Sequence, residues 1–207
     1  MKCSLTGLLL IVSPIVAAIA WFAYGGILGN PDQENAQAMI GALSQHAVGA
    51  KWALSIAILA IIAVAGGLAG IKESMSGGSG HQIMGLGLLL FVISLAGAVA
   101  ESGLLIGTAD AAAGGNMAVA GPLYGASNSV GGLSAAIGFV GITLIGGSFL
   151  VQKNVNVIIA ALFTLTGIVG VVISAGLDYP SNLLVIPYVA FMVMTLAIGV
   201  VHCRAKS

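Results

Sequence analysis

One ionisable side chain, Glu101, lies inside a long segment of apolar and small residues that spans positions 83–110. A charged group near the centre of a membrane costs about 3 kcal/mol on insertion scales, so such a residue is a functional-site candidate by default. We expect Glu101 to take one of two roles. It either binds a proton or a cation in a cavity open to the outside, with pH-dependent occupancy, or it reaches the outer interface and accepts hydrogen bonds from neighbouring helices.

Further titratable side chains stand in segments that we predict to lie outside the membrane. A rim of carboxylates can concentrate cations, or bind a metal together with a histidine. The spacing of these residues matches no known metal motif, however, and solvated loop acids or helix caps are the simpler interpretation. The candidate rim residues are Asp32, Glu34, His46, Asp110 and Asp178.

The sequence carries no pattern typical of a catalytic or cofactor site. It lacks a Ser-His-Asp pattern, an HExxH motif and a nucleotide-binding loop. Its three histidines lie in loops or at span boundaries, whereas a haem within a bundle needs facing histidines at membrane depth. The formal net charge is zero, so nothing indicates a nucleic-acid partner. We therefore expect neither enzymatic activity nor a bound cofactor.

The composition predicts the elements that must position these residues. Hydrophobic residues make up 59% of the 207 positions and charged residues only 6%, against about 25% charged in soluble domains. About 20 apolar residues cross a hydrocarbon core roughly 30 Å thick. We predict an all-α integral membrane protein in which a single polytopic domain covers residues 1–207. Its six transmembrane helices are expected at 5–28, 48–71, 83–107, 128–151, 155–176 and 182–202.

The basic residues predict the orientation of these helices. With both termini inside, Lys51 is the one basic residue on the outer side, and the other five of the six lie inside. This positive-inside bias predicts cytoplasmic N- and C-termini, in a topology that suits a prokaryotic plasma membrane. Cys3 and Cys203 would then lie where thiols normally stay reduced, so no disulfide is expected.

The outer loops indicate a further short helix and a repeat. Residues 30–34 resemble a helix cap followed by proline and acids, and apolar residues recur at helical spacing from Ala36 to Ala47. This pattern predicts a short amphipathic helix on the outer membrane surface or on the protein's own outer face. The second outer loop is expected at 108–124. A shift of the sequence lays Gly29 on Gly107, which suggests three helical-hairpin repeats.

Glycines are the second strong signal, since 31 occur and many fall inside the spans. Small residues four positions apart let membrane helices approach closely. Packing within the six helices accounts for most of them, and we expect the remaining small-residue faces to contact another chain. The candidate packing positions are Gly66, Gly70, Gly103, Gly107, Gly132, Gly138, Gly141 and Gly170.

Two functions follow from these patterns. The first hypothesis is a non-catalytic structural or accessory subunit whose partners are the lipid bilayer and other membrane subunits or copies of itself. The alternative is a small transporter or channel for a proton, a cation or a small solute, with Glu101 in an outward-facing cavity. The scattered polarity within the spans favours the first, and the isolated carboxylate favours the second.

Overall fold

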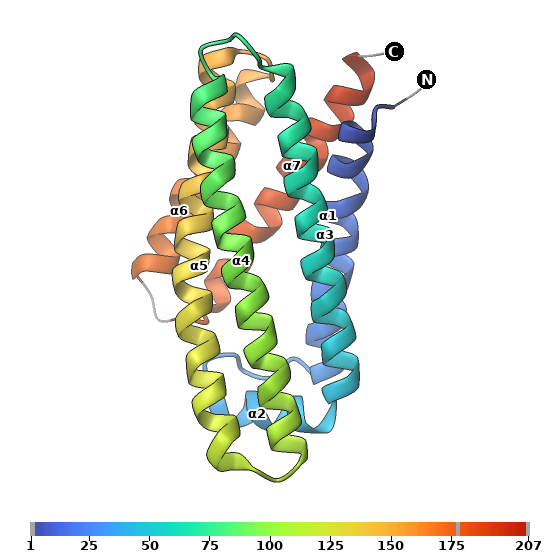
Figure 1. Ribbon diagram of the computed structural model, residues 1–207, viewed down its shortest axis with the longest axis vertical. Coiled ribbons are helices and arrows are strands. Elements are labelled where there is room, and N and C mark those ends of the chain that lie inside the picture. Colours follow the sequence, from blue (N-terminus) through green and yellow to red (C-terminus); the bar gives the residue numbers. More distant parts are fainter. Residues whose placement is uncertain (1–2, 177–178, 206–207) are drawn as a thin grey trace.

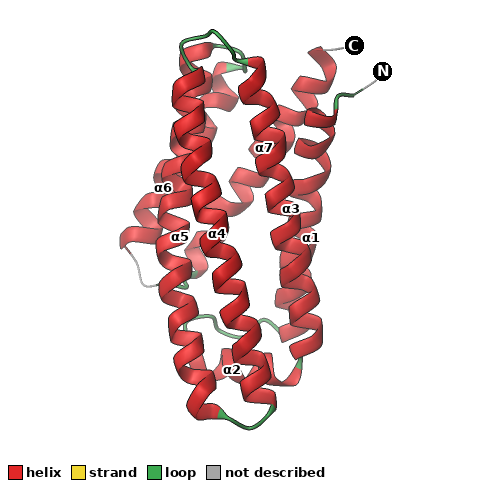
Figure 2. Cartoon of the chain, in the orientation of Figure 1, coloured by secondary structure: helices red, strands yellow, loops and turns green. Residues whose placement is uncertain are grey.

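The computed structural model describes residues 3–176 and 179–205, and those residues are almost entirely helical (Figure 2). Six of the helices are long and apolar enough to span a membrane, which confirms the predicted fold class. A short helix follows the first of them, also as predicted. The elements are α1 (Leu5–Leu28), α2 (Ala36–Gln45), α3 (Ala47–Ser74), α4 (His81–Ala113), α5 (Met117–Gln152), α6 (Val157–Gly176), the 3-10 turn η1 (Asn182–Leu184) and α7 (Val185–Ala205).

The six long helices form a closed ring. Each packs against the next one along the chain, and α7 packs against α1. They pair as the antiparallel hairpins α1–α3, α4–α5 and α6–α7 (Figure 1). Both chain ends lie at one end of the bundle, the terminal end, and α2 lies at the other, the α2 end (Figure 1). The ring therefore encloses an interior to which every long helix contributes.

The two cysteines meet at the terminal end. A disulfide joins Cys3 to Cys203 across 200 residues of sequence, and their Cα atoms are 4.7 Å apart. The expectation of two separate reduced thiols is wrong for this structure. The prediction rested only on the reducing character of the expected compartment. The packing of α1 against α7 brings Cys3 and Cys203 together.

The helix α2 covers the bundle's own end. Its N-cap is Asn35, whose side-chain oxygen accepts a hydrogen bond from the Ala38 amide at 3.1 Å. The cap predicted at Asn30 is therefore wrong. Asn30 instead has a left-handed backbone, with φ of 50°, in the loop after α1. The apolar face of α2 packs into the bundle and buries Leu43 completely.

The hairpin α4–α5 is longer than predicted. Residues 108–124 are helical except for a tight turn at 114–116, so the expected second outer loop is wrong. At 1.5 Å per residue, α4 and α5 are each about 50 Å long, well beyond a hydrocarbon core of roughly 30 Å. They project past the other helices at the α2 end (Figure 1). The proposed repeat also differs locally, because Gly29 terminates α1 with φ of 76° whereas Gly107 lies within α4.

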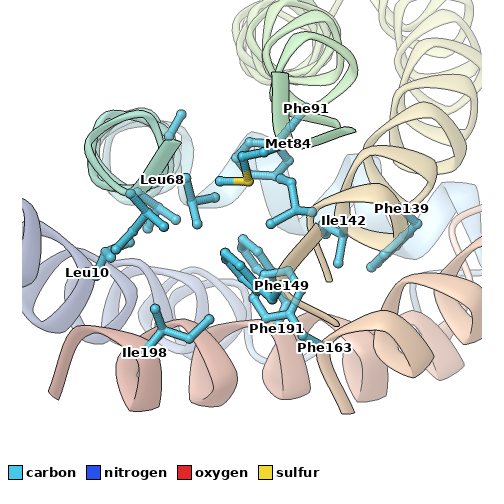
Figure 3. Packing of buried hydrophobic residues seen from close by; sticks show 14 of the residues in the cluster. Leu10, Leu68, Met84, Phe91, Phe139, Ile142, Phe149, Phe163, Phe191 and Ile198 are labelled. Carbon is cyan, nitrogen blue, oxygen red and sulfur yellow. The ribbon is translucent and has the colours of Figure 1, made fainter. Parts of the chain in front are cut away.

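Two hydrophobic cores fill the ring. The core near the terminal end draws large side chains from all six long helices, which converge on the centre (Figure 3). The second core lies at the α2 end and joins α2 to α1, α3, α4 and α5. The labelled side chains of the first core are Leu10, Leu68, Met84, Phe91, Phe139, Ile142, Phe149, Phe163, Phe191 and Ile198.

Small residues bring α4 and α5 together along their length. A Cβ atom added at Gly141 would lie 2.7 Å from the Gly87 carbonyl oxygen and 2.8 Å from the Phe91 amide nitrogen. Further along the same seam, Gly138 lies against Ser94 and Gly97 against Ser134. The two backbones therefore approach as closely as small-residue packing allows.

The other predicted packing glycines divide by environment. Gly70 of α3 lies against Thr6 of α1, and Gly170 of α6 lies against Phe139 of α5. The helix pairs α1–α3 and α5–α6 therefore also have a glycine at a close contact. Gly66, Gly107 and Gly132 have more distant neighbours, at 3.8, 3.4 and 3.1 Å from an added Cβ. Gly103 is exposed and has no atom within 4 Å of that position.

Candidate functional site

Glu101 lies on α4 about 30 Å from its His81 end, at 1.5 Å per residue. The side chain is half-buried and faces into the ring. Its Oε1 accepts a 2.7 Å hydrogen bond from the hydroxyl of Tyr179, in the linker between α6 and η1. The linker therefore reaches the carboxylate from the α2 end, where α6 stops well short of α4 and α5 (Figure 1).

Three of the four tyrosines of the chain line one interior space together with this carboxylate. They are Tyr24 from α1, Tyr179 from the linker and Tyr188 from α7. The fourth, Tyr124 of α5, donates its hydroxyl to the Gln33 carbonyl at 3.2 Å. Phenol groups can donate hydrogen bonds to a carboxylate or accept them from a cation.

Two adjacent glycines on α5 make room for the Glu101–Tyr179 pair. A Cβ at Gly131 would lie 2.5 Å from Cε1 of the Tyr179 ring and closer still to the Glu101 carboxylate oxygen. At Gly132 the added atom would lie 3.1 Å from the Tyr179 Cβ. The pair can form only because α5 carries no side chain at position 131.

A cavity of about 140 Å³ lies beside Glu101, between the two hydrophobic cores. Its walls come from α1, α3, α4, α5 and α7 and are mainly apolar. Among the residues that the structure describes there, Glu101 is the one charged residue, and Ser94 and Ser102 add hydroxyl groups. Aromatic side chains dominate one side, among them Trp21, Tyr24, Phe91, Phe139, Tyr188 and Phe191.

A second space of about 510 Å³, the outer groove, lies at the α2 end. It is more polar than the cavity and is bounded by the loop before α2, by α5 and by the linker that carries Tyr179. Its polar side chains include Gln33, Glu34, Asn128, Ser181 and Asn182. Tyr179 lines both the groove and the cavity, so its ring stands between the two spaces.

The hydroxyl of Tyr179 is held in its protonated form. Burial raises its pKa well above the ordinary value, and the charge of Glu101 raises it further. The group therefore remains a hydrogen-bond donor to Glu101 across the neutral pH range. This bond joins a residue that lines both groove and cavity to the carboxylate of the cavity.

The hydroxyl of Tyr24 is a buried polar group whose hydrogen-bonding capacity is unsatisfied in the described part of the chain. Its side chain is 8% exposed and lines the cavity, yet its buried hydroxyl has no hydrogen-bond partner within the described part of the chain. A buried polar group left unsatisfied costs about 1–3 kcal/mol. A ligand in the cavity with a hydrogen-bond donor would satisfy it.

The candidate rim residues do not join Glu101 in one site. Asp32 caps its own loop by accepting a 3.1 Å hydrogen bond from the Glu34 amide, and Glu34 borders the groove. His46 is exposed after α2, and Asp110 forms a surface ion pair with Lys51. Asp178 lies outside the described residues. Over residues 3–176 and 179–205, no three His, Cys, Asp or Glu side chains are arranged to hold a metal ion.

The chain stands apart from the proteins with which it was compared. No protein-family model, curated protein or solved structure matches it. Its function must therefore be inferred from the site itself.

The tyrosine cluster was missed in the sequence. Hydropathy singled out Glu101 because a charge interrupts an apolar run, but tyrosines are common near membrane interfaces and draw no attention singly. The available signal was their position, since each of the four lies near the same predicted membrane face. Three tyrosines from distant parts of the sequence line one space with a single carboxylate only in the folded ring.

Proposed function

We propose that this protein is a small membrane carrier that exchanges a proton for a cation at Glu101. The cation reaches Glu101 from the α2 side. The observation that carries the proposal is the place of Tyr179, which binds Glu101 and separates the cavity from the outer groove. Rotation of one ring would connect the carboxylate to the groove. Such a gate is what a carrier needs on one side of its binding site.

The surroundings of Glu101 suit reversible binding of one positive charge. The described part of the cavity lining carries a single carboxylate in mainly apolar walls, where charge pairing is stronger than in water. A carboxylate there must be neutralised by a proton or by a bound cation, because an unpaired charge is costly. Competition between the two ligands for one group couples their movements.

Replacing Glu101 with glutamine is expected to abolish cation-driven proton exchange in liposomes. The lumen is made acidic and holds a pH-sensitive dye, Na⁺, K⁺ or benzylammonium is added outside, and proton release is measured relative to protein-free liposomes. The wild-type protein should release protons in response to at least one of these cations, whereas E101Q should not. Glutamine keeps the size of the side chain but can neither ionise nor release a proton.

The variant Asp110→Asn is the matched control, since it removes a carboxylate of α4 that pairs with Lys51 at the surface and lines neither space. It should exchange like the wild type. Equal exchange by E101Q and the wild type would refute the proposal, as would a wild-type protein that responds to none of the cations.

The hypothesis of a structural or accessory subunit stays a prediction. Many large apolar side chains are exposed on the ring, as expected for contact with lipid. The exposed Gly103 is a small-residue position that a neighbouring helix could approach. A carrier that works as an oligomer would satisfy both hypotheses.

A further inference from the structure

We infer that the cavity at Glu101 binds a primary ammonium ion attached to an apolar body about the size of one aromatic ring. This inference rests on the proposed function and names the class of cation. It follows from three properties of the cavity, which are its volume, its aromatic walls and its unsatisfied hydroxyl.

The volume sets the size of the body. The cavity measures about 140 Å³. An apolar protein cavity of about 150 Å³ is known to hold one benzene molecule. A single ring or a short branched alkyl group therefore fits, and a larger polycyclic cation does not.

The walls favour an organic cation over an inorganic one. Four aromatic rings form a continuous row, in which neighbouring centroids are 6.3 Å apart for Tyr24–Trp21, 6.3 Å for Trp21–Tyr188 and 5.0 Å for Tyr188–Phe139. The faces of such rings attract ammonium groups. A hard metal ion instead prefers about six oxygen ligands, and this mainly apolar lining offers few.

The polar atoms favour a cation that donates hydrogen bonds. Glu101 has one carboxylate oxygen bonded to Tyr179, and the buried hydroxyl of Tyr24 has no partner in the described part of the chain. A primary ammonium has three donors. It can donate to Glu101 and to Tyr24 together, whereas a quaternary ammonium can pair its charge with Glu101 but donates a hydrogen bond to neither.

Two routes would bring such a ligand to the cavity from two sources. Tyr179 separates the cavity from the outer groove, through which a water-soluble amine would arrive. On another side the cavity is lined by Phe22 of α1 and Val189 of α7, whose side chains are 63% and 40% exposed on the lipid-facing surface. A long-chain amine dissolved in the membrane would enter between these helices, with its ammonium group and first few carbons in the cavity and the rest of its chain in the lipid. The ammonium chemistry is the same for both.

The test is a titration of the purified protein in detergent with benzylamine, followed by calorimetry and, in a Trp52→Phe background that leaves one tryptophan, by the fluorescence of Trp21. Benzyl alcohol, which has the same ring but no charge, serves as the matched control ligand. Benzylamine should bind at least about tenfold more tightly than benzyl alcohol, because only the amine forms a charge-assisted pair with Glu101. E101Q should remove that difference, and Tyr24→Phe should weaken benzylamine binding several-fold while keeping the aromatic ring.

A second experiment compares the affinity for dodecylamine supplied in vesicle membranes with the affinity for benzylamine supplied in water. The amine that binds more tightly identifies the source, membrane or water, and either outcome supports an ammonium ligand. Equal binding of benzylamine and benzyl alcohol, or unchanged binding in folded E101Q, overturns the inference. If Na⁺ or K⁺ drives Glu101-dependent proton exchange while benzylamine does not bind, the inference fails and the proposed function stands. If there is neither Glu101-dependent proton exchange nor benzylamine binding, both the inference and the proposed function fail.

Discussion

The variant Gly131→Ala is expected to lose at least about nine-tenths of its cation exchange while it still folds. The added methyl group would occupy the space of the Glu101 carboxylate and would lie 2.5 Å from the Tyr179 ring. Both are side-chain ends that can rotate away, so the helices need not move apart. The pair itself cannot remain, and the gate and the binding group are displaced together. Proton exchange in the liposome assay measures the loss.

The variant Gly125→Ala is the matched control for this experiment. It makes the same change on the same helix at a position with no atom within 4 Å. Alanine is favoured over glycine in a helix by about 1 kcal/mol, so this variant should be as stable as the wild type or slightly more so. It should also exchange normally. Full exchange by Gly131→Ala would show that the Glu101–Tyr179 geometry is not required.

The variant Gly141→Leu is expected to cause the largest loss of stability. Its Cβ would meet the backbone of α4 at Gly87 and Phe91, and backbone atoms cannot rotate away as side chains do. The two longest helices would have to separate along their seam. Overpacking of a well-packed interior typically costs about 1–3 kcal/mol, and we expect the upper end of that range. Unfolding of the purified protein by denaturant in detergent gives the free energy.

The control for this stability measurement is Gly147→Leu on the same helix. An atom added at Gly147 has no neighbour within 4 Å. Its free energy of unfolding should stay within about 1 kcal/mol of the wild type, since substitutions away from packed features have small effects. Comparable destabilisation by both variants would mean that the α4–α5 contact at Gly141 is less tight than the structure indicates.

The spans and Glu101 could be predicted because both depend on local composition. Long apolar runs identify membrane helices whatever their partners, and a single charge within one is visible in the sequence. The ends of α4 and α5 could not be placed in this way. Residues 108–124 are rich in alanine, glycine and polar residues and resemble a loop, but α2 packs on Ala109, Ala112 and Ala120 and stabilises them as helix.

The site could be predicted only in part, because its members meet through the ring. Tyr24 and Tyr188 lie far apart in the sequence, yet closure of α7 onto α1 places both beside Glu101. The same closure brings Cys3 to Cys203. Gly131 was not among the candidate packing glycines, although its neighbour Gly132 was, since sequence spacing does not reveal which glycine faces a side chain.

The most direct test of the account is the accessibility of a cysteine placed in the cavity. Ala98→Cys lines the cavity, and Ala100→Cys, on the same helix, is exposed on the ring's outer surface and serves as the control. Both are made with Cys3 and Cys203 replaced by serine. A cationic methanethiosulfonate reagent is added to either side of sealed vesicles, whose sides are assigned by labelling Gln45→Cys at the α2 end.

We predict that the cysteine at position 98 reacts with reagent from the α2 side only, and faster when Tyr179 is also replaced by alanine. The cysteine at position 100 should not react from either side. Reaction at position 98 from the terminal side, or no reaction even without the Tyr179 ring, would contradict a Glu101 cavity gated by Tyr179.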